Sequence, residues 1–288
     1  MTTKKDTTYR IQGGRVGVLL IHSLAGTPAE MRYVAHGLAR AGYTVHCPLI
    51  AGHGGSETDL KAATWQDWLH SAETALDELR KECDVVICSG LSTGALLCLM
   101  LAAKHPEKVQ GTALLAPTFW LNGWMIPWYA QLFRLVRHSW FANLFRFPDI
   151  KPHGIKDDRI RDFIRKALSS DSASVANLPE KPGVAVLEHH RLVNKLLPAL
   201  GQVEQPALIM HSREDDYADL NNAWHLQKNL KGMVDMVVLD DCYHIVTVDR
   251  QRHVVVERMV CFADRLAAQL AGRAETATTA TIALNSAS

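Results

Sequence analysis

Several features are missing from this sequence, and each absence excludes a class of protein. The formal net charge is only +1, with Lys and Arg scattered rather than clustered, so no electrostatic footprint for nucleic acid is present. The first residues, MTTKKDTTYR, lack the apolar stretch of a signal peptide. The six cysteines form no C-x-x-C motif, which favours a reducing compartment, the cytoplasm. No His, Cys or Asp grouping has metal-ligand spacing, so we expect neither a metal nor another cofactor.

One segment, Thr112 to Phe133, lacks any charged residue and is long enough to span a bilayer. Prolines, a glycine and an asparagine interrupt it, and its first part has the length of a buried strand. Helix breakers need compensation in lipid, so we expect no transmembrane helix here.

Apolar runs of strand length alternate with amphipathic helical patterns along most of the chain. Strands are expected at Arg15–Ser23, Tyr43–Pro48, Asp84–Ser89, Gly111–Ala116, Pro206–Ser212 and Met233–Leu239. Helices are expected from Thr27 to Gly42, from Thr64, and at Thr93–His105, Asp219–Leu230 and Gln251–Leu270. Such alternation predicts a parallel sheet covered by helices on both faces.

Two of these helix starts carry a capping-box pattern. Thr27 precedes a proline and has Glu30 three residues on, while Thr64 has Asp67 three residues on. Gly42 is placed to end the first helix.

The alternation stops between Thr118 and about Gly201, where the sequence is first aromatic-rich and then mostly helical in pattern. A connection of that length predicts an inserted cap. The expected organisation is a polar tail (1–8), one α/β domain (9–117 and 202–271), a helical cap (118–201) and a disordered tail (272–288).

The stretch VVICSGLSTGALLCL places Ser92 between Gly90 and Gly94, in the pattern G-x-S-x-G. A buried strand precedes the motif and a helix follows it, which is the setting of a nucleophile elbow. The alternative, a small residue filling a tight strand-to-helix turn, stays open on the motif alone.

A serine hydroxyl needs a base, and that base needs an orienting acid. Asp215 and Asp216 follow the strand PALIMHS, and His244 comes shortly after the last strand, beyond Asp240 and Asp241. All of them lie at carboxyl ends of strands, where sheets of this kind place their sites, and the order Ser, Asp, His is the one expected.

Six motifs together resemble the α/β-hydrolase superfamily, and more narrowly its monoacylglycerol-lipase and small bacterial carboxylesterase group. They are LLIHSLAGTPAEM, AGYTVHCPLIAGHGGS, TWQDW, GLSTG, PALIMHSREDD and YHIVTVD, spread from about residue 11 to 265. The resemblance implies an α/β-hydrolase fold with Ser92 as nucleophile, Asp215 as acid and His244 as base. Asp216 is the main rival acid and is otherwise expected to be a solvated loop carboxylate. Asp240 and Asp241 lie close to His244 in sequence and could also orient it.

The resemblance also implies an oxyanion hole made by the backbone N–H groups of Leu24 and Thr93, with His22 bracing the loop and His53 in a hydrogen-bonded turn. Ser23 departs from the family pattern, which has glycine there. Either the loop geometry differs, or the Ser23 hydroxyl points into the site. Four further histidines fall in helical patterns and are expected at the surface or partly buried: His189, His190, His225 and His253.

Aromatic and apolar residues at the start of the cap are candidates for an acyl channel. The substrate-binding candidates are Trp120, Trp124, Met125 and Trp128, with Phe119, Ile126 and Phe133 nearby. They could instead form the core of the cap, or an exposed patch that docks transiently on lipid or a partner.

These expectations amount to a serine ester hydrolase that acts through an acyl-enzyme on a small-molecule or lipid-like ester with an apolar acyl group. Thioesterase, lysophospholipase and C–C bond hydrolase activities are alternatives with the same residues. A catalytically silent binding protein on the same fold is an alternative of another class. The protein is expected to be a monomer or a homodimer.

Overall fold

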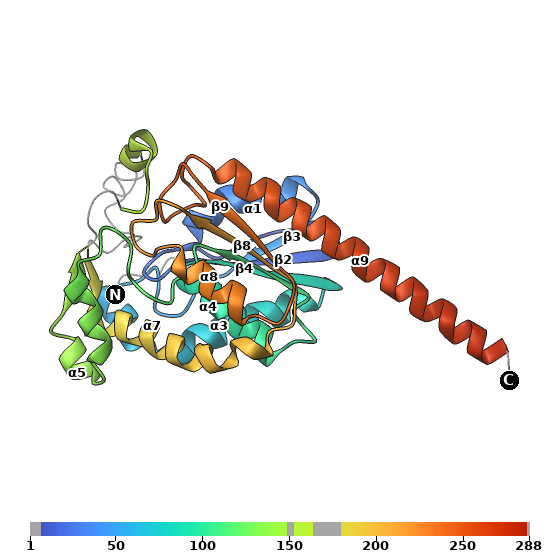
Figure 1. The fold of residues 1–288 in the computed structure, drawn as a ribbon, viewed down its shortest axis with the longest axis horizontal. Helices are drawn as coiled ribbons and strands as arrows, with labels where there is room; N and C mark the ends of the chain where they lie inside the picture. Colours follow the sequence, from blue (N-terminus) through green and yellow to red (C-terminus); the bar gives the residue numbers. More distant parts are fainter. Residues whose placement is uncertain (1–6, 149–152, 164–179, 287–288) are drawn as a thin grey trace.

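A seven-stranded sheet forms the centre of the computed structural model, which describes residues 7–148, 153–163 and 180–286 (Figure 1). The strand order is β1-β3-β2-β4-β5-β8-β9, with only β1 antiparallel to its neighbour. The strands are β1 (Tyr9–Ile11), β2 (Val16–Ile21), β3 (Thr44–Cys47), β4 (Val85–Leu91), β5 (Gly111–Leu115), β8 (Ala207–Ser212) and β9 (Val234–Leu239). The predicted α/β class is confirmed, and the short edge strand β1 is an addition to it.

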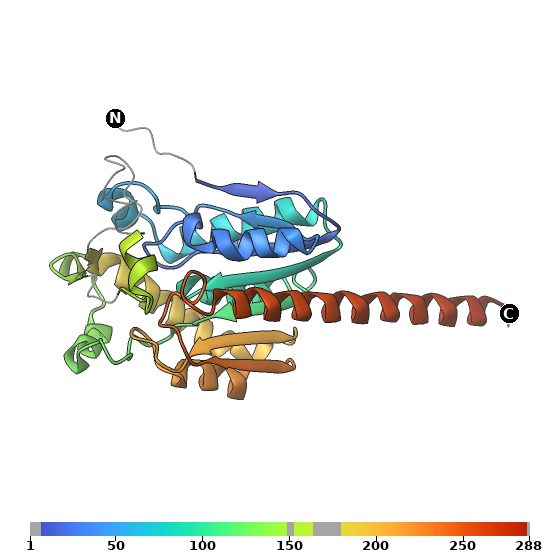
Figure 2. The same cartoon turned by 90° about the horizontal axis from the view of Figure 1, so that it is seen from above.

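Side chains of β2 alternate between two hydrophobic clusters, one on each face of the sheet. Val18 and Leu20 pack on the face covered by α1 (Arg32–Arg40) and α9 (Arg252–Ser286). Leu19 and Ile21 pack on the opposite face, beneath α3 (Trp65–Arg80) and α4 (Thr93–Lys104). Each such side chain contributes roughly 1.5–3 kcal/mol when fully buried. Figure 1 shows α1 and α9 on one side of the sheet and α3 and α4 on the other, and Figure 2 looks onto the sheet from the side of α9.

The structure confirms one of the two predicted capping boxes. Thr64 and Asp67 form the predicted capping box at α3, and an equivalent box starts α2 (Glu57–Ala62) at Ser56. The capping box predicted at Thr27 is wrong: no side-chain hydrogen bond caps the short 3₁₀ helix η1 (Pro28–Met31) there. The Glu30 carboxylate instead accepts hydrogen bonds from Ser23.

The 118–201 segment is not wholly helical. It contains the 3₁₀ helices η2 (Trp128–Leu135) and η3 (Leu197–Gln202), the helices α5 (Ser139–Ala142) and α7 (Gly183–Leu196), and an antiparallel pair, β6 (Arg146–Pro148) with β7 (Glu180–Pro182). Leu192, Val193 and Leu196 of α7 belong to the same hydrophobic cluster as α3 and α4. The end of the segment is therefore part of the helical layer of the main domain.

The last helix is longer than the sequence predicts. A helix was expected to end near Leu270 before a disordered tail, but α9 continues to Ser286 and projects away from the sheet (Figure 1). Past Gly272 the sequence has no glycine or proline and is rich in alanine, a strong helix former, which favours continuation. None of the helices in the described ranges is long and apolar enough to cross a membrane. All six cysteines are free thiols.

Candidate active site

Ser92 occupies a sharp turn between the end of β4 and the start of α4. Its backbone has φ 57° and ψ −115°, a conformation that costs a non-glycine residue about 1–3 kcal/mol. The Ser92 N–H donates to the Leu115 carbonyl of the neighbouring strand at 2.8 Å, which anchors the turn to the sheet. The structure thus has the strained strand-turn-helix geometry that the sequence predicted.

The two glycines of the motif are required by close backbone contacts. A Cβ on Gly90 would lie 2.3 Å from the carbonyl carbon of Gly94, and a Cβ on Gly94 would lie 2.3 Å from the Ile21 oxygen. Any side chain at either position would push α4 away from β2 and β4.

Asp215 and His244 form a buried pair beyond the carboxyl ends of β8 and β9. His244 Nδ1 lies 2.8 Å from Asp215 Oδ2, and the amides of Tyr217 and Ala218 donate to Asp215 Oδ1 at 2.8 Å. Burial opposes ionisation of both groups, but their mutual attraction outweighs it. The pKa of Asp215 is therefore held below its usual value and the pKa of His244 is raised.

Asp216 corrects one expectation, because it is fully buried rather than solvated. Its carboxylate accepts from the backbone N–H of His244 at 3.2 Å and from that of Gly154 at 2.9 Å, and burial raises the pKa of Asp216. It thus fixes the His244 main chain, whereas Asp215 contacts the ring. Asp240 and Asp241 instead pair with arginine or lysine side chains near the surface.

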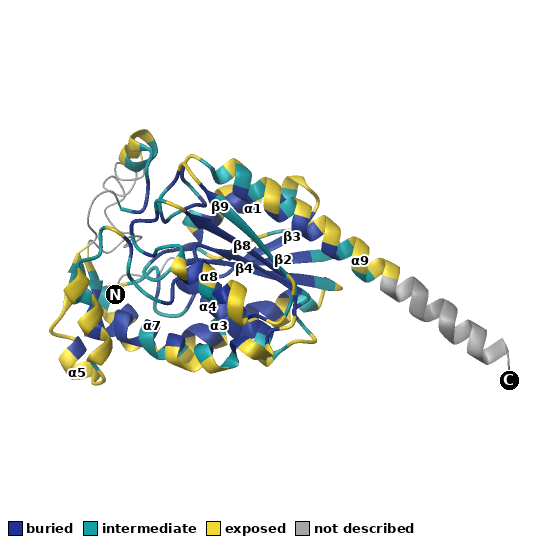
Figure 3. Ribbon diagram, in the orientation of Figure 1, coloured by how far each residue is buried: buried dark blue, intermediate teal, exposed yellow. Residues whose placement is uncertain are grey.

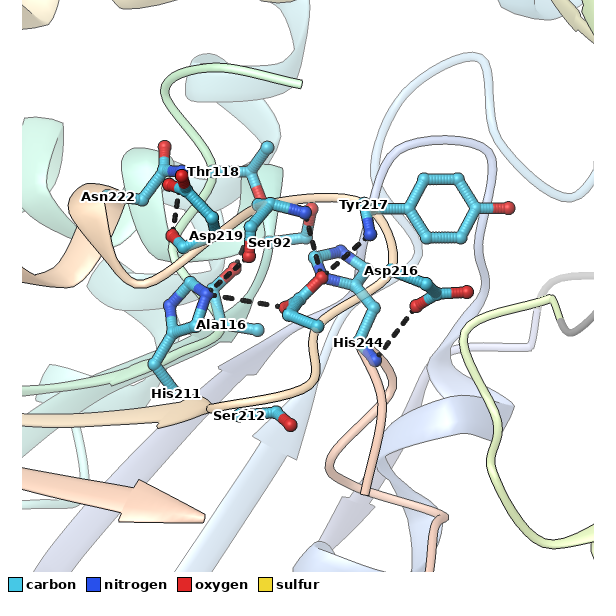
Figure 4. Close-up of polar contacts among 12 residues, drawn as sticks. Ser92, Ala116, Thr118, His211, Ser212, Asp216, Tyr217, Asp219, Asn222 and His244 are labelled. Carbon is cyan, nitrogen blue, oxygen red and sulfur yellow. Dashed lines mark hydrogen bonds and ion pairs between the residues drawn. The ribbon is translucent and has the colours of Figure 1, made fainter. Parts of the chain in front are cut away.

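The Ser92 hydroxyl donates to Thr118 Oγ1 at 3.1 Å, and Thr118 in turn donates to the Ala116 carbonyl at 3.0 Å (Figure 4). Within the described residues, no hydrogen bond joins Ser92 to His244, although both line the same cavity. A hydrogen bond from Ser92 to His244 would therefore require the Ser92 hydroxyl to rotate away from Thr118.

Hydrogen bonds hold the loop from His22 to Thr27, whose residues 23–27 line the same cavity as Ser92. The Ile50 amide donates to His22 Nε2 at 3.1 Å, so the proton of this ring is on Nδ1, which donates to the Ser23 carbonyl at 3.0 Å. Burial lowers the pKa of His22 to about 3, so the ring stays neutral. His22 therefore braces the 22–27 loop as expected, and His53 lies in a turn as expected, bonded to Ala51.

The conformation and contacts of Ser23 explain how serine is accommodated where the family pattern has glycine. Its backbone is not in the left-handed region, so glycine is not required there, and Ala25 carries the positive φ of 61° instead. The backbone N–H of Ser23 donates to Glu30 Oε1, and the Ser23 hydroxyl donates to Glu30 Oε2 at 3.1 Å. Burial raises the pKa of Glu30. The Ser23 hydroxyl is thus directed at the Glu30 carboxylate.

A cavity of about 1300 Å³ opens over Ser92 and His244. Leu24 and Thr93 line it, together with Trp120, Ile126 and Phe133 from the cap candidates. The prediction fails for three others: Trp124, Met125 and Trp128 do not line this cavity, and Phe119 is buried in the main core. Trp124 instead donates its indole N–H to the Glu214 carbonyl and packs against Tyr243, while Trp128 is exposed; periodicity could not show these contacts.

His189 was missed by the sequence reasoning, which expected a surface or partly buried histidine. It is buried, lines the cavity from α7, and places Nδ1 3.0 Å from the hydroxyl of Thr93. His190 and His225 are half-buried, and His253 is exposed. Among the described residues no group of three or more His, Cys, Asp or Glu side chains is placed to hold a metal ion.

Residues 14–251 match the model of one protein family, described as serine aminopeptidase, S33. The chain belongs to this family of α/β-hydrolases. The hydrolase is 28% identical to a thermostable monoacylglycerol lipase of Bacillus sp. (strain H-257), over 88% of this chain and 92% of that protein. It is 23% identical to a carboxylesterase of Bacillus subtilis (strain 168), over 92% of this chain and 98% of that protein.

Solved structures resemble the hydrolase over nearly its full length. A structure from the metagenome-derived lipolytic enzymes LipS and LipT has a TM-score of 0.73 at 26% identity, covering 90% of this chain and 97% of that one. A monoacylglycerol lipase of Paleococcus ferrophilus has a TM-score of 0.72 at 14% identity, covering 91% and 99%. The second likeness shows the shared fold only.

Proposed function

We propose that this hydrolase is a serine carboxylic-ester hydrolase that acts through an acyl-enzyme on esters with an apolar acyl group. The observation that carries the proposal is the His244–Asp215 pair opening onto the same cavity as Ser92, which sits in a strained elbow. In this arrangement Ser92 is the nucleophile, His244 the general base and Asp215 the acid that orients it.

The hydrogen bonds fix which nitrogen of His244 acts as base. Because ionised Asp215 accepts from Nδ1, the lone pair of neutral His244 is on Nε2. Nε2 takes the Ser92 proton as Oγ attacks the ester carbonyl, and then gives that proton to the departing alcohol. Water repeats the sequence on the acyl-enzyme and releases the carboxylic acid.

We assign the developing oxyanion to the backbone N–H groups of Leu24 and Thr93, both of which line the cavity. The Ser23 carbonyl, which belongs to the same peptide unit as the Leu24 N–H, accepts from His22 and from Gly26. Such bonds polarise the unit and strengthen its N–H as a donor. The Glu30 carboxylate fixes the other side of Ser23, so Glu30 is a positioning residue for this donor.

The cavity lining supports an apolar acyl group, since Trp120, Ile126 and Phe133 contribute to it. Relatives named monoacylglycerol lipase and carboxylesterase support ester chemistry. Thioesters and lysophospholipids remain alternative substrates for the same groups. The six free thiols support action in the cytoplasm.

The decisive experiment compares the unmodified protein with Ser92→Ala on p-nitrophenyl esters of increasing acyl length, with a thioester and an aminoacyl p-nitroanilide alongside. We expect ester hydrolysis, single-site labelling by a fluorophosphonate, and loss of both in Ser92→Ala. Ser139→Ala, at an exposed serine of α5, is the control and should behave as the unmodified protein. Full esterase activity of Ser92→Ala, or anilide cleavage without esterase activity, would reject the proposal.

A further inference from the structure

A cluster of large apolar side chains stands exposed around the mouth of the cavity, on η2, on α5 and just after α5. We call it the rim: Trp128, Tyr129, Leu132, Leu135, Trp140 and Leu144. Trp128 is 76% exposed and Leu135 77%, while Trp140 and Leu144 are each 71% exposed. Figure 3 shows this part of the molecule as mostly exposed. Side chains of this kind gathered in one patch mark an interaction surface.

The rim is continuous with the cavity, because four of its six members also line the cavity: Tyr129, Leu132, Leu135 and Trp140. Whatever covers the rim therefore also covers the entrance to Ser92. A molecule leaving that covering surface would enter the cavity without crossing water.

The charge of this segment has one sign only. No Asp or Glu occurs from Thr118 to Pro148, whereas Arg134 and Arg137 lie exposed among the rim side chains. Within the described part of the chain neither arginine has an acidic partner, and Arg134 has only long hydrogen bonds to Gln131. Arg146, by contrast, pairs with Glu57 and Glu180 and adds little.

Exposed tryptophan and tyrosine next to unpaired arginine have the chemistry of a membrane interface. Their rings are apolar with one polar atom and favour the headgroup level, while arginine is attracted to anionic headgroups. We propose that the rim docks the protein on a lipid bilayer containing anionic lipid, with the cavity mouth against the membrane. This inference rests on the proposed function for its substrate, but docking itself is measured without catalysis.

The test is sedimentation of the full chain with vesicles of phosphatidylcholine, with and without phosphatidylglycerol, at low and high salt. We expect binding to the phosphatidylglycerol vesicles, weakened at high salt because surface charges are then screened. Ser92→Ala should bind equally, which separates docking from chemistry.

Two pairs of variants assign the binding to the rim. Trp128→Ser with Leu144→Ser should weaken partitioning by about tenfold or more, since both side chains lose apolar contact with lipid. Arg134→Gln and Arg137→Gln should each weaken it by about fivefold, for phosphatidylglycerol vesicles only. The matched controls are Trp224→Ser, on α8 (Asn221–Asn229), and Arg40→Gln on α1, which are exposed outside the rim and should bind as the unmodified protein.

Several results would overturn the proposal. Absence of vesicle binding is one, and equal binding to both vesicle types is another. Binding that is unchanged in the rim variants, or that falls equally in the controls, is a third. A dimer in analytical ultracentrifugation that dissociates in Trp128→Ser with Leu144→Ser, without vesicle binding, would make the rim a contact between two copies instead. Circular dichroism and thermal unfolding confirm that each variant is folded.

Discussion

Glu30 holds Ser23 through both of its donors, the backbone N–H and the hydroxyl, and both residues line the cavity. Ser23 directly precedes Leu24, whose amide we assign to the oxyanion hole. A carboxylate seven residues further on therefore fixes the serine that stands where the family pattern has glycine.

Removing the Glu30 carboxylate should raise the free energy of the transition state more than that of the bound substrate. We expect Glu30→Ala to lower kcat by about 100-fold with a small change in KM, because the Leu24 donor loses its fixed position. Glu30→Gln keeps one acceptor and one group that can bond the Ser23 hydroxyl, so it should stay within about tenfold. Affinity for a trifluoromethyl ketone should fall in parallel with kcat/KM. Loss of thermal stability in Glu30→Ala with unchanged ketone affinity would show a merely structural role.

Glu30 should also make the protein less stable as pH rises. Because its pKa is raised on folding, the folded chain binds a proton that the unfolded chain releases near pH 4.5, so stability falls above that pH. Glu30→Gln lacks this cost. We expect its Tm, relative to the unmodified protein, to be higher at pH 8 than at pH 4. An equal difference at both pH values would contradict ionisation of Glu30 as the cause.

The roles of Asp215 and Asp216 should be distinguishable from the kcat values of their asparagine variants. Asp215→Asn removes the group that orients the His244 ring and should lower kcat by about 10⁴-fold. Asp216→Asn loses one of two backbone contacts, which should cost about 1–3 kcal/mol of stability and less than tenfold in kcat. Similar kcat values for the two variants would reassign the acid.

The pH dependence of kcat/KM offers an independent check on the same pair. Activity needs neutral His244, and Asp215 raises the pKa of that ring above the usual 6.5. The acid limb should therefore have its midpoint above pH 6.5, and residual activity of Asp215→Asn should show a lower midpoint. A midpoint that is unchanged in Asp215→Asn would contradict the pairing.

Much of this architecture follows from local signals in the sequence. Thr64 with Asp67 caps a helix as predicted, and the positive φ of Gly42, 94°, follows the end of α1 as predicted. Ser56 with Asp59 carries the same capping signal, which is sufficient to predict the start of α2. The capping-box pattern of Thr27 and Glu30 gave a wrong prediction, because the Glu30 carboxylate accepts hydrogen bonds from Ser23 in the preceding loop rather than from the start of its own helix.

The parts that the sequence did not reveal depend on contacts distant along the chain. Thr118 meets Ser92 only because β4 and β5 pair, and His189 meets Thr93 only because α7 packs against α4. Asp216 likewise accepts a hydrogen bond from Gly154, which lies 62 positions earlier in the inserted segment. Periodicity indicates which residues share a face, but it does not indicate which face meets which neighbour.

The two amides assigned to the oxyanion hole belong to segments that touch main chain to main chain, where Gly94 meets the Ile21 carbonyl. Their spacing is therefore set by the close approach of Gly94 to the backbone atoms of Ile21 and His22. A segment transplanted from a relative into 120–182 would alter which molecules enter while leaving the two donors in register. Such a graft would have to keep Gly154, because its amide donates to the Asp216 carboxylate that fixes the His244 main chain.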